Sequence, residues 1–568
     1  MALRIPDNPG VALAPSPDGR HADPEAREQA WLRPPSGPPP LAAPDVLWLL
    51  VAVLASLALR IPFFTVPMIH DEGGYAYAAR GWFEGTGQLY HDLWISRPQG
   101  IFLVYGAVFE LLGDGVLALR FAAWVFAALS IVAIWLFARR WSTPTVANVA
   151  AVIAGVLLSL PHLEAFTANA EIFMGMPVAF SAFWLLRQYQ EGWSHWQVIG
   201  VGVLIGIATQ LKPSGVTMTA VAVAFLLLAV DFPRRARLRL CADVGLGLAL
   251  VALPTFVHGW FLGWREFIYA TITYRLTQQS SATVGIGHHI DALRGLFSSR
   301  AALAMVLLVL LILGLRHRVV LAERARWRAL PRQVRDVSAH APAALFSYHP
   351  VPPFRLFRPQ DGAGMLIRLW ALGALGGIAL GGDWWTHYLI QGVPPLALWL
   401  AYNVVLISHT LRRSLRWLFQ VAVAGLLLVS FTVLIGSRDG IAQRLFNYPG
   451  YPAQEEIARY LSEHSDPDRT IYVAFDQAAI YYLADRRPAY RHLYEQELRA
   501  IPSAYAEIIA IIRSPDRPQY LVTTREPGSF ADDSRAFWRE VGLYYEVETT
   551  IGGVPIYREK PASELPPT

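Results

Sequence analysis

Long apolar stretches separated by short polar loops dominate the middle of the chain. Eleven of them are long enough to consider as membrane spans, at about 45–64, 116–138, 145–161, 172–187, 196–210, 215–230, 241–262, 301–315, 364–382, 387–408 and 415–436. A helix of about 20 apolar residues crosses the ~30 Å hydrocarbon layer of a bilayer. The pattern therefore predicts a polytopic α-helical membrane protein with about 11 spans. The apolar segment at 100–113 is shorter and predicts a surface-lying or re-entrant helix.

Residues 437–568 follow a different pattern, with more charge and shorter apolar runs. Two buried strands are predicted there, at 469–475 and 519–524. Two helices are predicted at 503–513 and 529–540, and a hairpin at 545–557. The hairpin has Gly552-Gly553 at its middle. We therefore expect a small C-terminal α/β domain on the extracytoplasmic side.

The first 44 residues are rich in Pro, Gly, Asp and Arg and contain no apolar run. Such a segment buries too little surface to fold alone, so we expect a disordered cytoplasmic tail. It contains no cleavable signal peptide, and the first span is expected to act as an uncleaved anchor. The predicted domains are this tail at 1–44, a membrane domain at 45–436 and the α/β domain at 437–568.

Composition supports this architecture. The chain has 568 residues, of which 54% are hydrophobic and only 16% are charged, whereas charged residues make up roughly a quarter of soluble domains. A large soluble enzyme is therefore excluded. The single cysteine, Cys241, excludes an internal disulfide framework and a cysteine-cluster metal site.

Arginines predict the orientation, since basic residues accumulate in cytoplasmic loops. They gather in or beside alternate loops, at 139–140, 234–239, 316–335 and 412–416. The loops at 65–115, 162–171, 211–214, 263–300 and 383–386 then face outward. The N-terminus is expected inside and the C-terminus outside. The basic loop at 316–363 fits an ordinary topogenic loop, which could touch anionic lipid headgroups, better than a nucleic-acid or lipid patch. Membrane lipids are expected as partners, and no nucleic-acid partner is expected.

The first outer loop carries the most informative residues. His70-Asp71-Glu72-Gly73-Gly74-Tyr75 places two carboxylates at the mouth of the bundle, and glycines behind them could let a substrate approach the backbone. A carboxylate there is costly unless it is paired or used. Asp71 could act as a general base on a hydroxyl. Alternatively, it could cap a helix that starts near Tyr75.

Arg97 follows in the same loop, next to Pro98. Its planar guanidinium could bind phosphate oxygens through two hydrogen bonds. The alternative is an anchor that faces lipid headgroups at the membrane interface.

Three further outer positions could reach the same place. Glu171 could ligate a divalent cation together with Asp71, or it could complement the dipole of its helix. Lys212 could neutralise the phosphate of a leaving group, or its side chain could extend to the interface. His387, followed by Tyr388, could bind phosphate or a metal, whereas Trp384-Trp385 fits an interfacial belt. The pair His288-His289 fits an ordinary polar loop better than a metal site.

Five motifs in this order resemble the GT-C glycosyltransferases of family-39 type, which include protein O-mannosyltransferases, aminoarabinose transferases and related bacterial lipopolysaccharide sugar transferases. The motifs are Asp71-Glu72-x-x-Tyr75, Gly87-x-x-Tyr90-x-Asp92-x-Trp94, Arg97-Pro98-x-Gly100, Gly202-x-x-x-Gly206-x-Ala208-x-x-x-Lys212-Pro213 and His387-Tyr388-Leu389-Ile390-Gln391-x-x-Pro394-Pro395. The resemblance covers about 45–436.

The resemblance implies a GT-C fold and an enzyme that takes sugar from a polyprenyl-phosphate donor on the outer face. The acceptor would be a glycan, a lipid or a protein. Asp71 would be the general base, and Arg97 would contact the lipid phosphate. Lys212 and His387 match positions that line the same pocket, and Glu72, Tyr75, Asp92 and Tyr388 are expected to contact substrate.

The chain departs from the family pattern beside Arg97. Gln99 stands where a second proline often follows, and Ser96 stands where some members carry an acidic residue used for metal. The resemblance therefore leaves a divalent cation, with Glu171 as its ligand, and a metal-independent reaction both open. The implied reaction is a single displacement with inversion.

Two other functions remain open on the sequence alone. A lipid or sugar transporter or flippase would be expected to show repeated halves and broken helices near the membrane midplane, and the chain shows neither. A catalytically inactive scaffold in the cell envelope would keep the fold and lose turnover. The motifs are the reason to prefer an enzyme.

Overall fold

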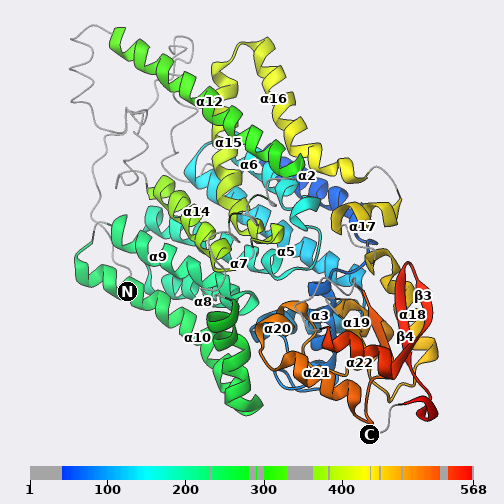
Figure 1. The fold of residues 1–568 in the computed structure, drawn as a ribbon. Helices are drawn as coiled ribbons and strands as arrows, with labels where there is room; N and C mark the ends of the chain where they lie inside the picture. Colours follow the sequence, from blue (N-terminus) through cyan, green and yellow to red (C-terminus); the bar gives the residue numbers. More distant parts are fainter. Residues whose placement is uncertain are drawn as a thin grey trace.

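A computed structural model describes residues 41–230, 232–279, 290, 294, 300–329, 362–381, 384–434, 437–446, 450–474, 477–524 and 535–565. The predicted N-terminal tail lies almost wholly outside these residues, as do His288-His289 and most of the basic loop. Helices form the larger part of the molecule, and one small sheet lies near the C-terminus (Figure 1).

Eight helical segments of the described chain are long and apolar enough to cross a membrane. They contain α2 (Ala43–Arg60), α5 (Val116–Trp141), α7 (Ala170–Glu191), α10 (Arg234–Ile268), α12 (Arg300–Ala329), α14 (Gly362–Leu380), α15 (Val393–Thr410) with the preceding 3₁₀ helix η7 (Thr386–Gly392), and α16 (Arg413–Leu428). The polytopic helical architecture predicted from the sequence is confirmed.

Three predicted spans form shorter helices: α6 (Pro144–Leu157), α8 (His195–Leu211) and α9 (Thr217–Leu228). Proline accounts for the end of α8, because the residue before a proline is restricted to extended conformations, and Lys212, which precedes Pro213, has φ of −151° and ψ of 132°. The segment expected to be a short helix is α4 (Gln99–Leu112).

The helices approach one another most closely where glycines face a neighbouring backbone. A Cβ added to Gly202 of α8 would lie 2.2 Å from the carbonyl oxygen of Val244 in α10. Small residues at such contacts allow close helix packing in membranes. Part of the predicted Gly-x-x-x-Gly motif therefore serves packing between α8 and α10.

The C-terminal part is a small α/β unit. Its sheet has the order β1-β2-β4-β3, from strands β1 (Ile471–Ala474), β2 (Tyr520–Thr523), β3 (Tyr545–Ile551) and β4 (Val554–Glu559). Strands β1 and β2 are parallel, and the other two pairs are antiparallel. Gly552 and Gly553 have φ of 57° and 82°, as a tight hairpin turn requires. Both predicted strands and the hairpin are confirmed.

Helices surround this sheet. They are α17 (Arg438–Phe446), α18 (Gly450–His464), α19 (Ala478–Ala484), α20 (Glu495–Ala500), α21 (Ala504–Arg513) and α22 (Ala536–Tyr544). The helix predicted at 503–513 corresponds to α21, while α22 begins at Ala536 and 525–534 lie outside the described residues. Figure 1 shows this unit, coloured gold to red, at one end of the bundle beside α3 (His70–Phe83).

Candidate active site

The first turn of α3 carries Asp71. The helix begins at His70, and its N-terminus is capped by the Glu72 carboxylate, which accepts a hydrogen bond from the backbone N–H of Ile69 (3.1 Å). The alternative in which Asp71 caps a helix starting near Tyr75 is therefore wrong. The Asp71 side chain is 15% exposed and is directed toward other polar groups of the loop.

Arg97 lies against Asp71. One of its Nη atoms is 4.0 Å from Asp71 Oδ2, and its Nε donates to the Tyr75 hydroxyl (2.8 Å). That hydroxyl donates in turn to Asp71 Oδ2 over 3.4 Å. The contacts are few and long, so Asp71 has acceptor capacity left for a substrate hydroxyl.

A second group comes from three other elements. Glu171 in the first turn of α7 forms a buried ion pair with Lys212, which follows α8. His387 in η7 lies 3.8 Å from the same carboxylate and 3.2 Å from Glu164 Oε2. The Lys212 ammonium lies 3.9 Å from the centroid of the Tyr388 ring, a cation–π contact.

The two groups form one electrostatic cluster. Burial alone would raise the pKa of Asp71, but the charges of His70, Arg97, His387 and Lys212 outweigh burial and hold this pKa below its ordinary value. For Arg97, burial would lower the pKa, but Tyr75 and Asp71, followed by Tyr388 and Glu171, raise it. The structure thus brings together Asp71, Tyr75, Arg97, Glu171, Lys212, His387 and Tyr388.

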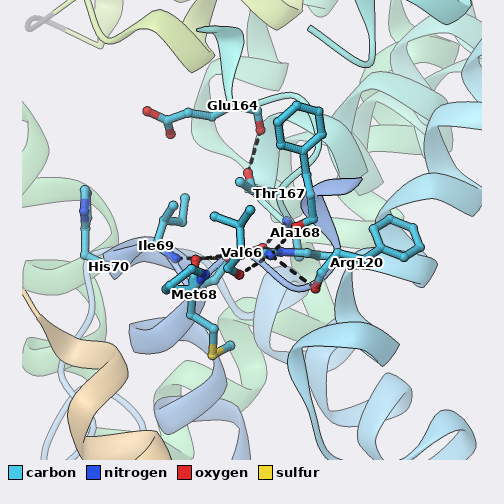
Figure 2. A network of polar contacts seen from close by, with 12 residues as sticks. Val66, Met68, Ile69, His70, Arg120, Glu164, Thr167 and Ala168 are labelled. Carbon is cyan, nitrogen blue, oxygen red and sulfur yellow. Dashed lines mark hydrogen bonds and ion pairs between the residues drawn. The ribbon is translucent and has the colours of Figure 1, made fainter. Parts of the chain in front are cut away.

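Glu72 does not join this cluster. Its carboxylate is fully buried and accepts from Arg120 of α5 (2.7 and 3.0 Å), from Ile69 N and from Ala168 N (2.7 Å). Arg120 also donates to the carbonyls of Phe63, Val66 and Pro67. Figure 2 shows Arg120 held among Val66, Ile69 and Ala168. The expected substrate contact of Glu72 does not fit a carboxylate so fully used by the protein.

Asp92 is also placed outside the cluster. Its side chain is 55% exposed and accepts from the backbone of Gln88 (3.0 Å), and it pairs with His91 (2.8 Å). These local bonds close the turn before Trp94. Asp92 therefore shapes the loop, and its expected contact with substrate is not supported by its position.

The glycines after Glu72 face protein as well. A Cβ on Gly73 would lie 2.2 Å from Ala479 Cα of α19, and one on Gly74 would lie 1.7 Å from the Tyr494 hydroxyl oxygen. The expectation that these glycines admit a substrate is therefore wrong. They admit the C-terminal unit.

The residues present do not fit a divalent cation. Glu171, the predicted ligand, is paired with the Lys212 ammonium and lies beside His387. Cationic neighbours repel a metal ion. Among the described residues there is also no group of three or more His, Cys, Asp and Glu side chains that could hold one.

The sequence did not reveal Arg120, Glu164, Arg275 or Tyr494. Arg275 donates through Nε to the carbonyl of Ser96 (2.9 Å) and so holds the Arg97 loop. The Tyr494 hydroxyl donates to the carbonyl of His70 (3.5 Å), the residue before the base, and burial, followed by the charge of Asp71, raises the pKa of Tyr494. Arg120, an arginine inside an apolar run, was the one visible signal, since such a residue needs a buried partner.

Residues 96–260 match the family of dolichyl-phosphate-mannose-protein mannosyltransferases. No curated protein matches the chain in sequence.

Solved structures extend the likeness to almost the whole chain. ArnT from Cupriavidus metallidurans in the apo state has a TM-score of 0.60, and ArnT bound to undecaprenyl phosphate has 0.58. Each is 14% identical and covers 93% of this chain and 100% of its own. The archaeal oligosaccharyltransferase AglB from Archaeoglobus fulgidus, in complex with an inhibitory peptide and a dolichol-phosphate, has a TM-score of 0.50 at 15% identity, covering 92% of this chain and 75% of its own.

At these identities the structures establish the fold. The chain has the architecture of ArnT, with a helical membrane part followed by a small α/β unit. Together with the family match, this confirms the resemblance to the GT-C glycosyltransferases.

Proposed function

We propose that this chain is a membrane glycosyltransferase. It transfers a sugar from a polyprenyl-phosphate donor to a hydroxyl of a glycan, lipid or protein acceptor, with inversion at the anomeric carbon. One observation carries the proposal above the others: a sparsely bonded carboxylate, Asp71, lies in one cluster with the cations Arg97 and Lys212 and with His387.

The relatives support the donor class. The titles of two solved structures name a polyprenyl phosphate as the bound ligand, undecaprenyl phosphate in ArnT and a dolichol-phosphate in AglB. A polyprenyl donor brings its own phosphate leaving group, so the enzyme needs cations at the membrane surface and no nucleotide-binding domain. The cluster offers such cations on three separate elements.

Each residue has a role in the displacement. Asp71 accepts the proton of the acceptor hydroxyl as its oxygen forms a bond to the anomeric carbon. The bond between that carbon and the phosphate oxygen breaks, and the phosphate keeps the electron pair. Arg97 and Lys212 stabilise the charge that develops on the departing phosphate. Tyr75 holds Arg97 toward Asp71, Glu171 holds Lys212, and His387 lies against the same Glu171 carboxylate.

We also propose the orientation and the domain limits. Residues 1–44 form a cytoplasmic tail, 45–436 the membrane domain and 437–568 an extracytoplasmic domain in a cell membrane. The distribution of arginines supports this orientation. The cluster then opens outward, where a flipped donor and an extracytoplasmic acceptor meet.

The test is sugar transfer by purified protein in lipid vesicles, with a panel of undecaprenyl-phosphate-linked hexoses and pentoses. The Asp71→Asn variant is expected to lose about 10²–10⁴-fold in turnover, the usual contribution of a general base. Its melting temperature should stay close to that of the wild type. Glu110→Gln on the exposed side of α4 is the control and should transfer normally.

Two results would contradict the proposal. Equal turnover by the Asp71→Asn variant would remove the base assignment. Absence of binding and turnover for every donor, in protein that is folded, would favour a transporter or a scaffold.

A further inference from the structure

One carboxylate beside the cluster has no part in the proposed displacement. Glu164 lies in the loop between α6 and α7, and its side chain is 22% exposed, more than those of Asp71 (15%) and Arg97 (12%). Its Oε2 lies 3.2 Å from His387 Nδ1. In the part of the chain that the structure describes, no hydrogen bond or ion pair reaches its other oxygen, Oε1. That oxygen is therefore available to a ligand.

The loop holds Glu164 in one defined position. Its φ of 52° and ψ of 24° lie in the left-handed region, which residues other than glycine seldom adopt. Its carbonyl accepts from the backbone N–H (3.0 Å) and the hydroxyl (2.7 Å) of Thr167, and the next residue, Ala168, donates to the buried Glu72 carboxylate. In Figure 2 the Glu164 carboxylate is directed away from the contacts of Arg120, while its carbonyl meets Thr167.

The neighbours of Glu164 connect it to both ends of the proposed donor site. Ionic contacts run from Lys212 through Glu171 and His387 to Glu164. Lys212 belongs to the end that takes the phosphate. His387 also lies near the base, since its charge helps to lower the pKa of Asp71. A sugar whose anomeric carbon lies at Asp71, with its phosphate toward Lys212, therefore has its ring beside His387 and Glu164.

The chemistry of the side chain limits what it can bind. An ionised carboxylate accepts hydrogen bonds and donates none, so it repels a phosphate and attracts hydroxyl groups. We propose that Glu164 determines which sugar is transferred: Oε1 accepts a hydrogen bond from a hydroxyl of the donor sugar, while Oε2 remains beside His387. This inference rests on the proposed function and names the residue that contacts the sugar ring.

Binding of donors in the absence of an acceptor tests this contact. The protein is placed in lipid nanodiscs, and calorimetry gives its affinity for three kinds of ligand. They are the undecaprenyl-phosphate hexose or pentose that the wild type binds most tightly, the single-deoxy analogues of that donor, and undecaprenyl phosphate alone. The wild type should bind at least one deoxy analogue about 10–100-fold more weakly than the parent donor, as for the loss of a hydrogen bond to a charged group.

Glu164→Gly removes the carboxylate from the enzyme. Glycine adopts a left-handed conformation readily, so the loop should keep its shape and the melting temperature should stay close to that of the wild type. This variant should bind the parent donor as weakly as the wild type binds the critical deoxy analogue, and it should no longer distinguish the two. Its affinity for undecaprenyl phosphate alone should be unchanged. Loss of either partner removes the same contact, so the two losses should not add.

Asp485→Gly is the matched control. Asp485 has the same left-handed conformation, with φ of 53°, and an exposed carboxylate that lies 3.7 Å from Arg80 Nη1, outside the cluster. This variant should bind the parent donor and every deoxy analogue as the wild type does.

Two results would overturn the inference while leaving the proposed function in place. The first is a Glu164→Gly variant that keeps the preference of the wild type among the deoxy analogues. The second is a variant that binds every ligand more weakly by the same factor, undecaprenyl phosphate included, because Glu164 would then act only on His387. A folded wild type that binds and transfers none of the undecaprenyl-phosphate sugars would instead contradict the proposed function, and this inference with it.

Discussion

Two adjacent carboxylates at the start of α3 have opposite environments. Glu72 faces the membrane helices, is fully buried and accepts from two nitrogens of Arg120 and two backbone N–H groups. Asp71 faces the loop that carries Arg97 and has one long hydrogen bond, from Tyr75, together with an ion pair at 4.0 Å to Arg97 and a contact at 4.0 Å with His70 Nε2. Both carry the same charge, and only Asp71 has room for another partner.

The difference indicates that Glu72 has a structural part, whereas Asp71 is free to take part in the proposed reaction. A carboxylate with all its acceptor sites used resists any further ligand, because a new bond must replace one already made in a low-dielectric setting. Glu72 joins α3 to α5 and to the segment before α7, and so fixes the place of its neighbour. Asp71 is then presented by a rigid turn, as a general base should be.

The largest effect on stability should come from breaking the buried ion pair between Glu72 and Arg120. Glu72→Ala leaves the Arg120 charge buried without its partner, and the loss of one member of a buried pair costs about 3–5 kcal/mol. We expect the melting temperature in lipid nanodiscs to fall strongly. The double variant Glu72→Met with Arg120→Met should recover much of this loss, since both charges are gone. A normal melting temperature for Glu72→Ala would mean that the two carboxylates differ less than their contacts indicate.

The next largest effect concerns binding of the donor at Arg97, beside Asp71. Arg97→Ala removes a cation from the proposed phosphate site, and a charge-assisted hydrogen bond contributes about 1.5–3 kcal/mol, or roughly 10–100-fold in affinity. Arg97→Lys keeps the charge but loses the planar donor set, so its affinity for the donor should lie between those of the wild type and Arg97→Ala. Binding of undecaprenyl phosphate, measured by calorimetry, gives the order. Unchanged affinity in Arg97→Ala would restore the interpretation of Arg97 as an interfacial anchor.

The sequence predicted the cluster better than it predicted the roles within it. Seven of the residues expected at the site meet there, because Glu171, Lys212, His387 and Tyr388 lie at ends of apolar segments that the hydropathy pattern defines, and the others lie in one loop between two such segments. Asp71 and Glu72 could not be told apart, since the partner of Glu72 is 48 residues away in α5. Gly73 and Gly74 were misinterpreted for the same reason: Ala479 and Tyr494 come from a unit far along the chain.

The span count was the weakest part of the sequence prediction. The runs at 145–161, 196–210 and 215–230 are apolar along their length but form helices of 12–17 residues. Hydropathy reports burial in lipid or protein alike and does not report where a helix ends. The strands of the C-terminal unit were predictable because short β-rich runs bounded by turn residues carry a local signal.

A smaller effect on stability should follow when the packing of the C-terminal unit against α3 is disturbed. Gly73→Ala places a methyl group against the backbone of α19, which cannot rotate away, and overpacking of this kind costs about 1–3 kcal/mol. Gly425→Ala in α16 is the matched control, because nothing lies within 4 Å of its added Cβ and alanine favours a helix. Melting curves should move down for the first and stay level or rise for the second. A level curve for Gly73→Ala would show that the unit is loosely docked.

The smallest effect is in the pH dependence of the base. The carboxylate must be ionised to accept a proton, and Arg97 is one of the charges that hold the pKa of Asp71 below its ordinary value of 3.8. The folded-state pKa is lowered, so activity should be retained as the pH falls toward 4 and be lost only below that. In Arg97→Lys the charge remains, and the acid limb of kcat/KM should hardly move. In Arg97→Ala it should move upward, and only in part, because His70, Lys212 and His387 remain. An acid limb that stays in place in Arg97→Ala would mean that Arg97 acts on the phosphate alone and not on the base.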